Sequence, residues 1–302
     1  MKRVVWIISE GSPGHVSQSE GLVAALAQKT NIELHVVQTR PRFGGFIRKF
    51  VSLWMGRNGN PMSDRFLKRR LGCEIHASIP NLIVTSGGKA VFAARSLAVK
   101  FGAPLVFIGE RKPYPSRWFH TVFTPSPSET DLYDVPVEMV PTGITPAMVN
   151  AAAYAWKDRP QGKLWAMIVG GASKSHHYTA EDWKLLGMKM NQLAEAHDIR
   201  WLISTSRRTG KEAEAILRTT IHPGHIARAV WWANKPEKLM NEFLGSAFWV
   251  FVTQDSVTMV TEAVASGRPV VVTMPAKISL EPGSFLPGYF ERLEKAARII
   301  RI

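Results

Sequence analysis

Short, continuously apolar runs alternate along the chain with longer stretches in which apolar residues recur every three or four positions. The first pattern predicts buried strands and the second predicts amphipathic helices. Because helical stretches follow most of the strands, the pattern predicts an α/β fold with parallel sheets. The expected strands are residues 4–9, 34–39, 82–86, 105–108, 122–124 and 137–140, then 164–169, 201–205, 229–232, 248–252 and 270–273.

The strands fall into two groups, which predicts two domains. Residues 142–162 lie between the groups, have little strand character and end in a Pro/Gly stretch typical of an interdomain connection. A chain of 302 residues is long enough for two domains of about 150 residues. We therefore expect two Rossmann-like domains, residues 1–145 and 163–285, that face each other across a cleft. Residues 286–302 are predicted to form a basic amphipathic helix that packs back on the first domain.

Residues 248–273 form the most informative stretch, because a strand, a polar turn, a helix and a second strand follow one another there. In such a βαβ unit, ligands bind at the carboxyl ends of the strands. Asp255 and Ser256 lie where the helix begins, and a helix N-terminus suits an anion such as phosphate. Ser256 is expected to hold a diphosphate. For Asp255, which would repel phosphate, two roles stay open: binding sugar hydroxyls or capping the helix.

Two further turns in the second half contain candidate anion ligands. After the strand at 201–205 come Ser206, Arg207 and Arg208, and a guanidinium group binds phosphate with two parallel hydrogen bonds. The alternative is a solvated basic turn. After the strand at 164–169, Gly171, Ser173 and Lys174 provide a second, weaker candidate.

The first half offers a candidate general base in the glycine-rich turn after its first strand. His15 has a side chain that exchanges protons near neutral pH, which suits removal of a proton from an acceptor hydroxyl. Glu10, in the same turn, either orients His15 or acts as the base itself. The alternative is a histidine that only holds its own loop together.

Composition narrows the function. The 38 Lys and Arg residues against 24 Asp and Glu give a net charge of +14, which indicates a polyanionic ligand or surface. The sequence contains no nucleic-acid recognition motif, so we expect no nucleic-acid partner. A single cysteine, Cys73, excludes an internal disulfide, and no His, Cys or acidic spacing typical of a metal site occurs. The apolar runs are far shorter than the roughly 18 residues that span a bilayer.

One segment, between Arg42 and Arg57, departs from the α/β pattern. It mixes basic residues with an aromatic-rich face that would form on a helix, with Phe46 and Phe50 on that face. This combination is typical of a helix lying in a membrane interface, and predicts contact with an anionic membrane surface. A core-packed helix with basic flanks is the alternative.

Four short motifs, taken together, resemble the family named after a plant mitochondrial fission factor, whose many bacterial members have a fold similar to that of GT-B glycosyltransferases. The motifs are Ser9-Glu10-Gly11-x-Pro13-Gly14-His15-x-x-Gln18, Gly170-Gly171-x-Ser173, Ser206-Arg207-Arg208-Thr209 and Asp255-Ser256-Val257-x-Met259-x-x-Glu262-Ala263. They occur in the expected order over most of the chain. The sequence departs from the family pattern at Glu10, where aspartate is more usual, and after Gly143, where a His-Arg pair is missing.

The resemblance implies a GT-B-like fold and nucleotide-sugar chemistry. Glu262 is similar in placement to the glutamate with which many GT-B transferases bind the ribose hydroxyls of the donor, and a carboxylate accepts two hydrogen bonds from a vicinal diol. An exposed helix glutamate is the alternative reading of Glu262. We expect a cytoplasmic protein, peripheral at the inner membrane face, that needs no cofactor and moves a sugar from a nucleotide-sugar to a lipid-linked or envelope acceptor. The alternative is a non-catalytic membrane adaptor that retains the GT-B shell.

Overall fold

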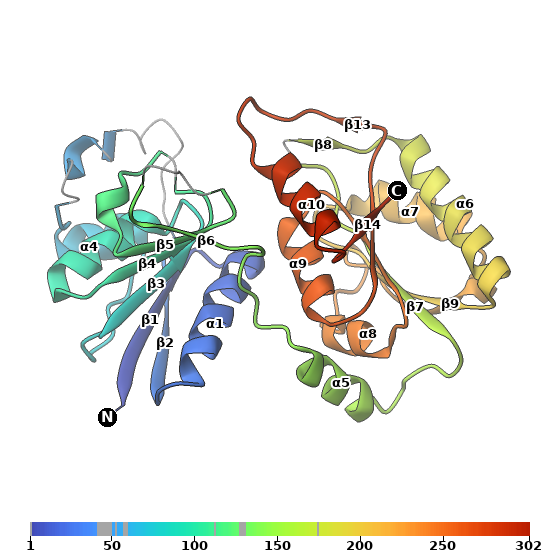
Figure 1. Cartoon of the computed structure of the whole chain (residues 1–302), viewed down its shortest axis with the longest axis horizontal. Helices are drawn as coiled ribbons and strands as arrows, with labels where there is room; N and C mark the ends of the chain where they lie inside the picture. Colours follow the sequence, from blue (N-terminus) through green and yellow to red (C-terminus); the bar gives the residue numbers. More distant parts are fainter. Residues whose placement is uncertain are drawn as a thin grey trace. The chain divides into compact units, whose positions relative to one another are not determined.

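The computed structural model describes residues 2–40, 50–51, 53–56, 60–111, 113–126, 131–173 and 175–302. The chain divides into two compact units, Met1–Gly143 and Ile144–Ile302. Each unit contains a six-stranded sheet in which all pairings are parallel (Figure 1). The α/β fold expected from the apolar pattern is therefore confirmed.

In unit 1 the strands lie in the order β2-β1-β3-β4-β5-β6. The strands are β1 (Arg3–Ser9), β2 (Ile32–Gln38), β3 (Leu82–Ser86), β4 (Leu105–Ile108), β5 (Thr121–Thr124) and β6 (Asp134–Pro136). The described helices are α1 (Pro13–Ala27), α3 (Asp64–Leu71) and α4 (Val91–Phe101), with a short 3-10 turn at Ser116–Trp118.

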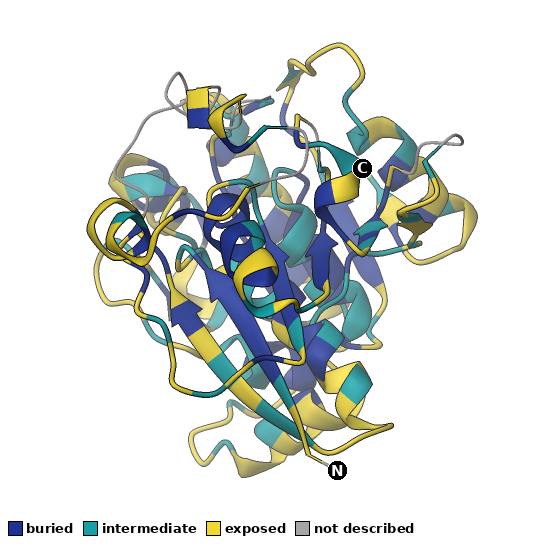
Figure 2. Cartoon of the chain, turned by 90° about the vertical axis from the view of Figure 1, so that its left-hand side faces the viewer, coloured by how far each residue is buried: buried dark blue, intermediate teal, exposed yellow. Residues whose placement is uncertain are grey.

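The central strand β1 shows why this sheet is buried on both faces. Successive side chains of a strand point to opposite faces. Trp6 and Ile8 therefore join one core cluster with α3 and α4, whereas Val5 and Ile7 join another with Val23 of α1. Strand segments with buried residues are drawn dark blue in Figure 2.

In unit 2 the strand order is β10-β9-β7-β11-β12-β14. The strands of this sheet are β7 (Leu164–Ile168), β9 (Arg200–Ser204), β10 (Ile226–Val230), β11 (Val250–Thr253), β12 (Val270–Thr273) and β14 (Ile300–Arg301). A separate antiparallel pair joins β8 (His176–His177) and β13 (Lys277–Ile278). The helices are α5 (Pro146–Ala155), α6 (Ala180–His197), α7 (Gly210–Thr220), α8 (Met240–Ser246), α9 (Val257–Ala265) and α10 (Leu286–Lys295), with a 3-10 turn at Pro223–His225.

Helices cover both faces of the second sheet. Crossovers between parallel strands are right-handed. Helices α6 and α7 connect β7 to β9 and β9 to β10, in one direction across the sheet, whereas α8 and α9 connect strands in the opposite direction. The two pairs of helices therefore lie on opposite faces. The core under α6 and α7 contains three large aromatic side chains, Trp183, Trp201 and Phe251.

The structure corrects two expectations for residues 134–162. The last strand of unit 1 is β6, at Asp134–Pro136, and not residues 137–140. The predicted connection at 142–162 contains α5, which packs on α8 within unit 2. Thr145 caps α5 by accepting a hydrogen bond from the backbone N–H of Met148, a pattern that the sequence analysis overlooked.

The C-terminal segment 286–302 is also different from the single helix that was expected to pack on the first domain. It belongs to unit 2 and consists of α10 followed by β14, which pairs with β12. Ala297 has a positive φ of 52°, which ends the helical conformation. The Tyr289 hydroxyl lies 2.8 Å from that of Thr261 in α9, so the buried face of α10 packs on its own unit.

The predicted segment between Arg42 and Arg57 falls mostly outside the described residues; of it, residues 50–51 and 53–56 are described. None of the helices in the described part of the chain is long and apolar enough to cross a membrane.

The N-terminus of α6 provides a test of local stability. Thr179 and Asp182 form a reciprocal capping box, and the second oxygen of Asp182 accepts a hydrogen bond of 3.0 Å from the Ala276 N–H. Burial opposes ionisation of Asp182, but its hydrogen bonds from Thr179 and Ala276 outweigh burial and lower its pKa.

We expect Asp182→Asn to lower the free energy of unfolding by about 1 kcal/mol at neutral pH, because the ionised carboxylate is the better acceptor. A carboxyl group whose pKa is lower in the folded than in the unfolded state stabilises the protein at pH values above its unfolded-state pKa. This stabilisation is lost as the pH falls through the folded-state pKa. The difference between wild type and variant should therefore shrink below the usual aspartate range. Urea unfolding over an acid pH series measures it, with Glu181→Gln, in the same first turn, as control. A difference independent of pH would contradict the prediction.

Candidate functional site

Each sheet has one place where the connections leave in opposite directions. In unit 1, β1 lies between β2 and β3, and in unit 2, β7 lies between β9 and β11. At such a switch point, the loops after neighbouring strands separate and leave a crevice at the carboxyl edge. The predicted site residues lie at these edges, after β1 in unit 1 and after β7, β9 and β11 in unit 2.

In unit 2, Asp255 connects all three loops. Its side chain is completely buried, and Oδ2 accepts hydrogen bonds from the Gly171 N–H at 3.0 Å and from Nη2 of Arg208 at 2.6 Å. Oδ1 accepts one from the Tyr178 hydroxyl at 3.2 Å. Burial raises the pKa of Tyr178, as do the charge and hydrogen bond of Asp255, so the phenol stays protonated and donates. The helix-capping role considered for Asp255 is wrong, because Ser256 is the N-cap of α9. The Asp255 oxygens accept hydrogen bonds from within the protein, and a role in sugar binding stays a prediction.

The two glycines after β7 allow this arrangement. A Cβ atom on Gly170 would lie 2.2 Å from Oδ2 of Asp255, and one on Gly171 would lie 2.2 Å from the carbonyl oxygen of Arg208. No side chain fits at such distances. Gly171 thus lets the loops approach, and its N–H donates to Asp255.

Hydroxyl groups fix the Gly170 backbone from both sides. The N–H of Gly170 donates to Thr253 Oγ1 at 2.7 Å, and its carbonyl oxygen accepts from Ser206 Oγ at 3.0 Å and from Thr209 Oγ1. Ser206, predicted as an anion ligand, therefore serves the loop structure. Thr253 and Thr209 were not singled out in the sequence, because a threonine in a turn gives no signal of its partner.

The two arginines after β9 differ in availability. Arg208 is paired with Asp255, so much of its charge is already balanced. Arg207 is exposed and forms no ion pair with any residue in the described part of the chain. Of the two, Arg207 is the side chain whose charge is available to an anion.

Ser256 is the N-cap of α9, and its hydroxyl accepts from the Met259 N–H at 3.4 Å. The first turn of α9 contains no acidic residue. The carboxylate of Asp255, which directly precedes this N-cap, is paired with Arg208. Glu262 lies further along the same helix and is half-buried. Both residues belong to one rigid element beside the Asp255 loop.

The loop after β7 continues into a small hydrogen-bonded turn. Ser173 Oγ accepts from the backbone N–H groups of Ser175 and His176 at 3.3 and 3.1 Å, so Ser173 is committed to the loop. Burial lowers the pKa of His176, against the nearby charge of Asp255, which favours the neutral ring. Lys174, also predicted as a ligand, lies outside the described residues.

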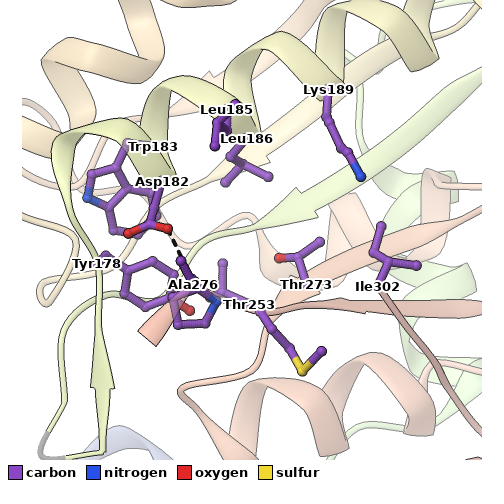
Figure 3. Close-up of a pocket in the computed structure, with 12 residues that line it drawn as sticks. Tyr178, Asp182, Trp183, Leu185, Leu186, Lys189, Thr253, Thr273, Ala276 and Ile302 are labelled. Atoms are coloured by element: carbon purple, nitrogen blue, oxygen red, sulfur yellow. Dashed lines mark hydrogen bonds between the residues drawn. The ribbon is translucent and has the colours of Figure 1, made fainter. Parts of the chain in front are cut away.

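Tyr178 and Trp183 stack with ring centroids 4.3 Å apart and line two pockets. One, of about 360 Å³, lies beside α6 and is largely apolar, with Lys189 at its edge (Figure 3). The other, of about 350 Å³, lies at the start of α7 and includes Arg208 and Lys211. Both volumes fall within the range of small-ligand sites.

The loop after β10 was missed by sequence reasoning. Glu214 of α7 is only 3% exposed and accepts hydrogen bonds from Thr205 Oγ1 at 2.6 Å and from the Ala233 N–H at 3.0 Å. The Trp232 N–H donates to Thr205 Oγ1 at 2.8 Å, and Trp232 is 41% exposed. A buried glutamate thus fixes an exposed tryptophan at the carboxyl edge of the sheet.

In unit 1, the predicted pair Glu10 and His15 is in contact, with Oε1 and Nδ1 2.7 Å apart. The Glu10 side chain is 10% exposed and that of His15 is 37% exposed. Burial alone would raise the pKa of Glu10, but the hydrogen bond and charge of His15, helped by Lys89, lower it below its usual value. The geometry makes Glu10 the orienting group and His15 the accessible one.

The turn after β3 lies next to the Glu10–His15 pair. Gly87, with φ of +83°, passes so close that a Cβ would lie 2.2 Å from Nδ1 of His15. Gln18 is buried and accepts from Ser86 Oγ at 2.5 Å. Arg111 forms ion pairs with Asp131 and Asp134. Gln18 and Arg111 thus have structural partners within unit 1.

Within the described residues, no cluster of His, Cys, Asp or Glu has the geometry to hold a metal ion. Each unit has its own carboxylate-centred loop system, around Glu10 in unit 1 and Asp255 in unit 2.

Comparison with known proteins identifies the family. The profile described as "Mitochondrial fission ELM1" matches residues 13–284. The chain belongs to this family. A relative, the uncharacterized protein RP120 of Rickettsia prowazekii (strain Madrid E), is 23% identical over 336 residues, which cover 98% of this chain and 90% of the relative.

Solved structures show the fold of this ELM1-family chain. The heptosyltransferase WaaC of E. coli, with ADP-2-deoxy-2-fluoro heptose, has a TM-score of 0.55 at 11% identity, covering 99% of this chain and 92% of that one. The UDP-GlcNAc 2-epimerase of Methanocaldococcus jannaschii has a TM-score of 0.53 at 13% identity, covering 100% and 89%. The epimerase of Neisseria meningitidis, bound to UDP-GlcNAc, has a TM-score of 0.51 at 15% identity, covering 96% and 85%. The GT-B fold expected from the motifs is confirmed.

The pairing of Asp255 with Arg208 can be tested by a double-mutant cycle. We expect Asp255→Asn to lower the free energy of unfolding by about 1 to 3 kcal/mol, because a buried, charge-assisted hydrogen bond is lost. Arg208→Gln should cost less, since that side chain is partly exposed, and the double variant should show coupling. Arg207→Gln, one residue away, is the control and should leave the unfolding midpoint unchanged. Equal effects of Arg207→Gln and Arg208→Gln would contradict the assignment.

Proposed function

We propose that this chain is a metal-independent glycosyltransferase that moves a sugar from a nucleotide-sugar donor to a lipid-linked or cell-envelope acceptor at the cytoplasmic face of the membrane. The observation that carries the proposal is the organisation of unit 2 at its switch point. Three loops are held around Asp255, whose charge is paired with Arg208, while Arg207 is exposed and Ser256 caps α9. Solved structures of the same fold contain ADP- and UDP-linked sugars, which supports the donor class.

In this proposal the donor diphosphate binds the N–H groups at the start of α9 and the Ser256 hydroxyl, with Arg207 on its oxygens. Glu262 accepts hydrogen bonds from the ribose hydroxyls. When the bond between the sugar and the diphosphate breaks, negative charge develops on the leaving oxygen. Arg207 and the helix dipole stabilise that charge.

His15 takes the proton from the acceptor hydroxyl as its oxygen attacks the sugar. Because Nδ1 lies 2.7 Å from the Glu10 carboxylate, Nδ1 carries a proton and Nε2 is left to act as base. The negative charge of Glu10 also stabilises the imidazolium that forms. The burial of Glu10 makes it a positioning residue.

Donor binding can be tested by thermal unfolding in the presence of UDP, GDP, CMP and ADP. We expect one of them to raise the midpoint, and Arg207→Gln to weaken its binding by about tenfold to a hundredfold, the scale of a charge-assisted hydrogen bond. Glu262→Gln should reduce the preference for the ribonucleotide over its 2′-deoxy form, because the carboxylate recognises the diol. Lys184→Gln, on α6, is the control. Absence of stabilisation by all four nucleotides would count decisively against the donor site.

A second candidate is a non-catalytic membrane adaptor with the GT-B shell. This candidate is favoured because several residues that were predicted to bind the donor form hydrogen bonds within the protein instead, namely Ser173, Arg208 and Asp255.

The two candidates differ in the role of His15. We expect His15→Asn to lower transfer of sugar by at least about a hundredfold, the scale of a lost general base, with unchanged nucleotide affinity. Glu10→Gln should lower transfer less and shift the pH profile, since it only perturbs His15. Turnover of labelled nucleotide-sugar with a membrane extract as acceptor measures both. If a cellular phenotype survives both His15→Asn and Glu262→Gln, the adaptor is correct.

A further inference from the structure

An exposed apolar patch lies on a helical stretch of unit 1. Val51 and Met55 are 8% and 0% exposed and anchor this stretch in the core. Leu53 and Trp54 project away from it, with exposures of 79% and 62%, and Phe50 is 59% exposed. Single exposed apolar residues are common, but a group of large ones on one short stretch marks a binding surface.

A basic helix lies beside this patch. The side chain of Trp54 packs against Phe66 of α3, with ring centroids 6.1 Å apart. Helix α3 is anchored by Leu67 and Leu71, which are fully buried. Its exposed positions carry four positive charges, on Arg65, Lys68, Arg69 and Arg70.

Helix stability explains only part of this charge. Basic residues in a last turn stabilise the helix dipole, but that effect is small and falls off within a turn. Asp64, the acidic residue of α3, is paired with Lys100 of α4. None of the four basic side chains forms an ion pair with a residue that the structure describes. Their charge is therefore directed at solvent, next to the exposed apolar side chains.

We infer that Leu53, Trp54 and the basic residues of α3, here called the α3 surface, bind an anionic lipid bilayer. Tryptophan side chains are enriched at the boundary between lipid headgroups and acyl chains. Transfer of an exposed leucine side chain from water into an apolar medium is favourable. Four cations within two turns match the negative potential of anionic headgroups. A nucleic acid would also attract the charge, but it offers Leu53 no apolar surface.

The inference rests on the proposed function only for its purpose, which is to bring the enzyme to a lipid-linked acceptor. Lipid binding itself needs neither His15 nor Glu262. The surface extends the sequence prediction for residues 42–57 to α3, through residues that the structure describes.

Sedimentation with vesicles tests the inference. The full chain should bind vesicles of phosphatidylcholine with phosphatidylglycerol, bind phosphatidylcholine alone far less, and dissociate as salt is raised. Replacing Lys68, Arg69 and Arg70 together by Gln should lower the partition coefficient by about a hundredfold, the scale for three cations near an anionic surface. Leu53→Ser with Trp54→Ser should lower it by at least about tenfold.

Two matched controls separate this surface from general charge and general apolarity. Replacing Lys157, Lys163 and Lys184, three exposed lysines of unit 2, by Gln removes the same charge, and Leu132→Ser removes an exposed leucine of unit 1. Both controls should bind vesicles as wild type does. All variants must show the wild-type unfolding midpoint.

The inference is overturned if the control triple loses as much binding as the α3 triple, or if the α3 surface variants bind as wild type does. Binding to a homopolymeric RNA but not to the vesicles would also overturn it. The variant Glu262→Gln distinguishes this test from the test of the proposed function, because it changes the proposed donor site and leaves the α3 surface intact. It should bind vesicles normally, whether or not the protein binds nucleotide.

Discussion

The second unit depends on a carboxylate that has no exposed surface. Removing such a group from water costs several kcal/mol unless donors surround it. Asp255 is surrounded by the Gly171 N–H, the Arg208 guanidinium and the Tyr178 hydroxyl, which come from loops that are distant in sequence. These loops cannot move independently without exposing the carboxylate to an incomplete set of partners. The carboxyl edge of the sheet is therefore preorganised before any ligand arrives.

Unit 1 uses the same arrangement on a smaller scale. Glu10 is largely buried at the switch point, bound to His15, and covered by Gly87, whose missing side chain makes room for the pair. In both units, a glycine in the turn after one strand packs against an acidic side chain in the turn after the adjacent strand. The difference is in the partner: Asp255 neutralises an arginine, whereas Glu10 leaves the outer side of an imidazole accessible.

The excess positive charge lies in at least two different local surroundings. Arg207 lies at the carboxyl edge of the second sheet, where α9 adds its helix dipole. The basic residues of α3 lie beside exposed Leu53 and Trp54 instead. A cation near a helix N-terminus suits a compact diphosphate, whereas cations beside apolar side chains suit a surface that is charged outside and apolar within. The local surroundings, and not the net charge, distinguish the two proposed uses.

The sequence by itself determined the parallel α/β fold, both glycine turns and the placement of His15, Arg207 and Ser256 at strand ends, because these follow from local periodicity. It did not reveal that Asp255 faces Gly171 and Arg208, or that 286–302 ends in a strand of the second sheet. Only the tertiary structure decided those points. Whether a polar side chain in a turn is free for a ligand depends on which groups the fold places opposite it, and such long-range partners leave no trace in the residues on either side.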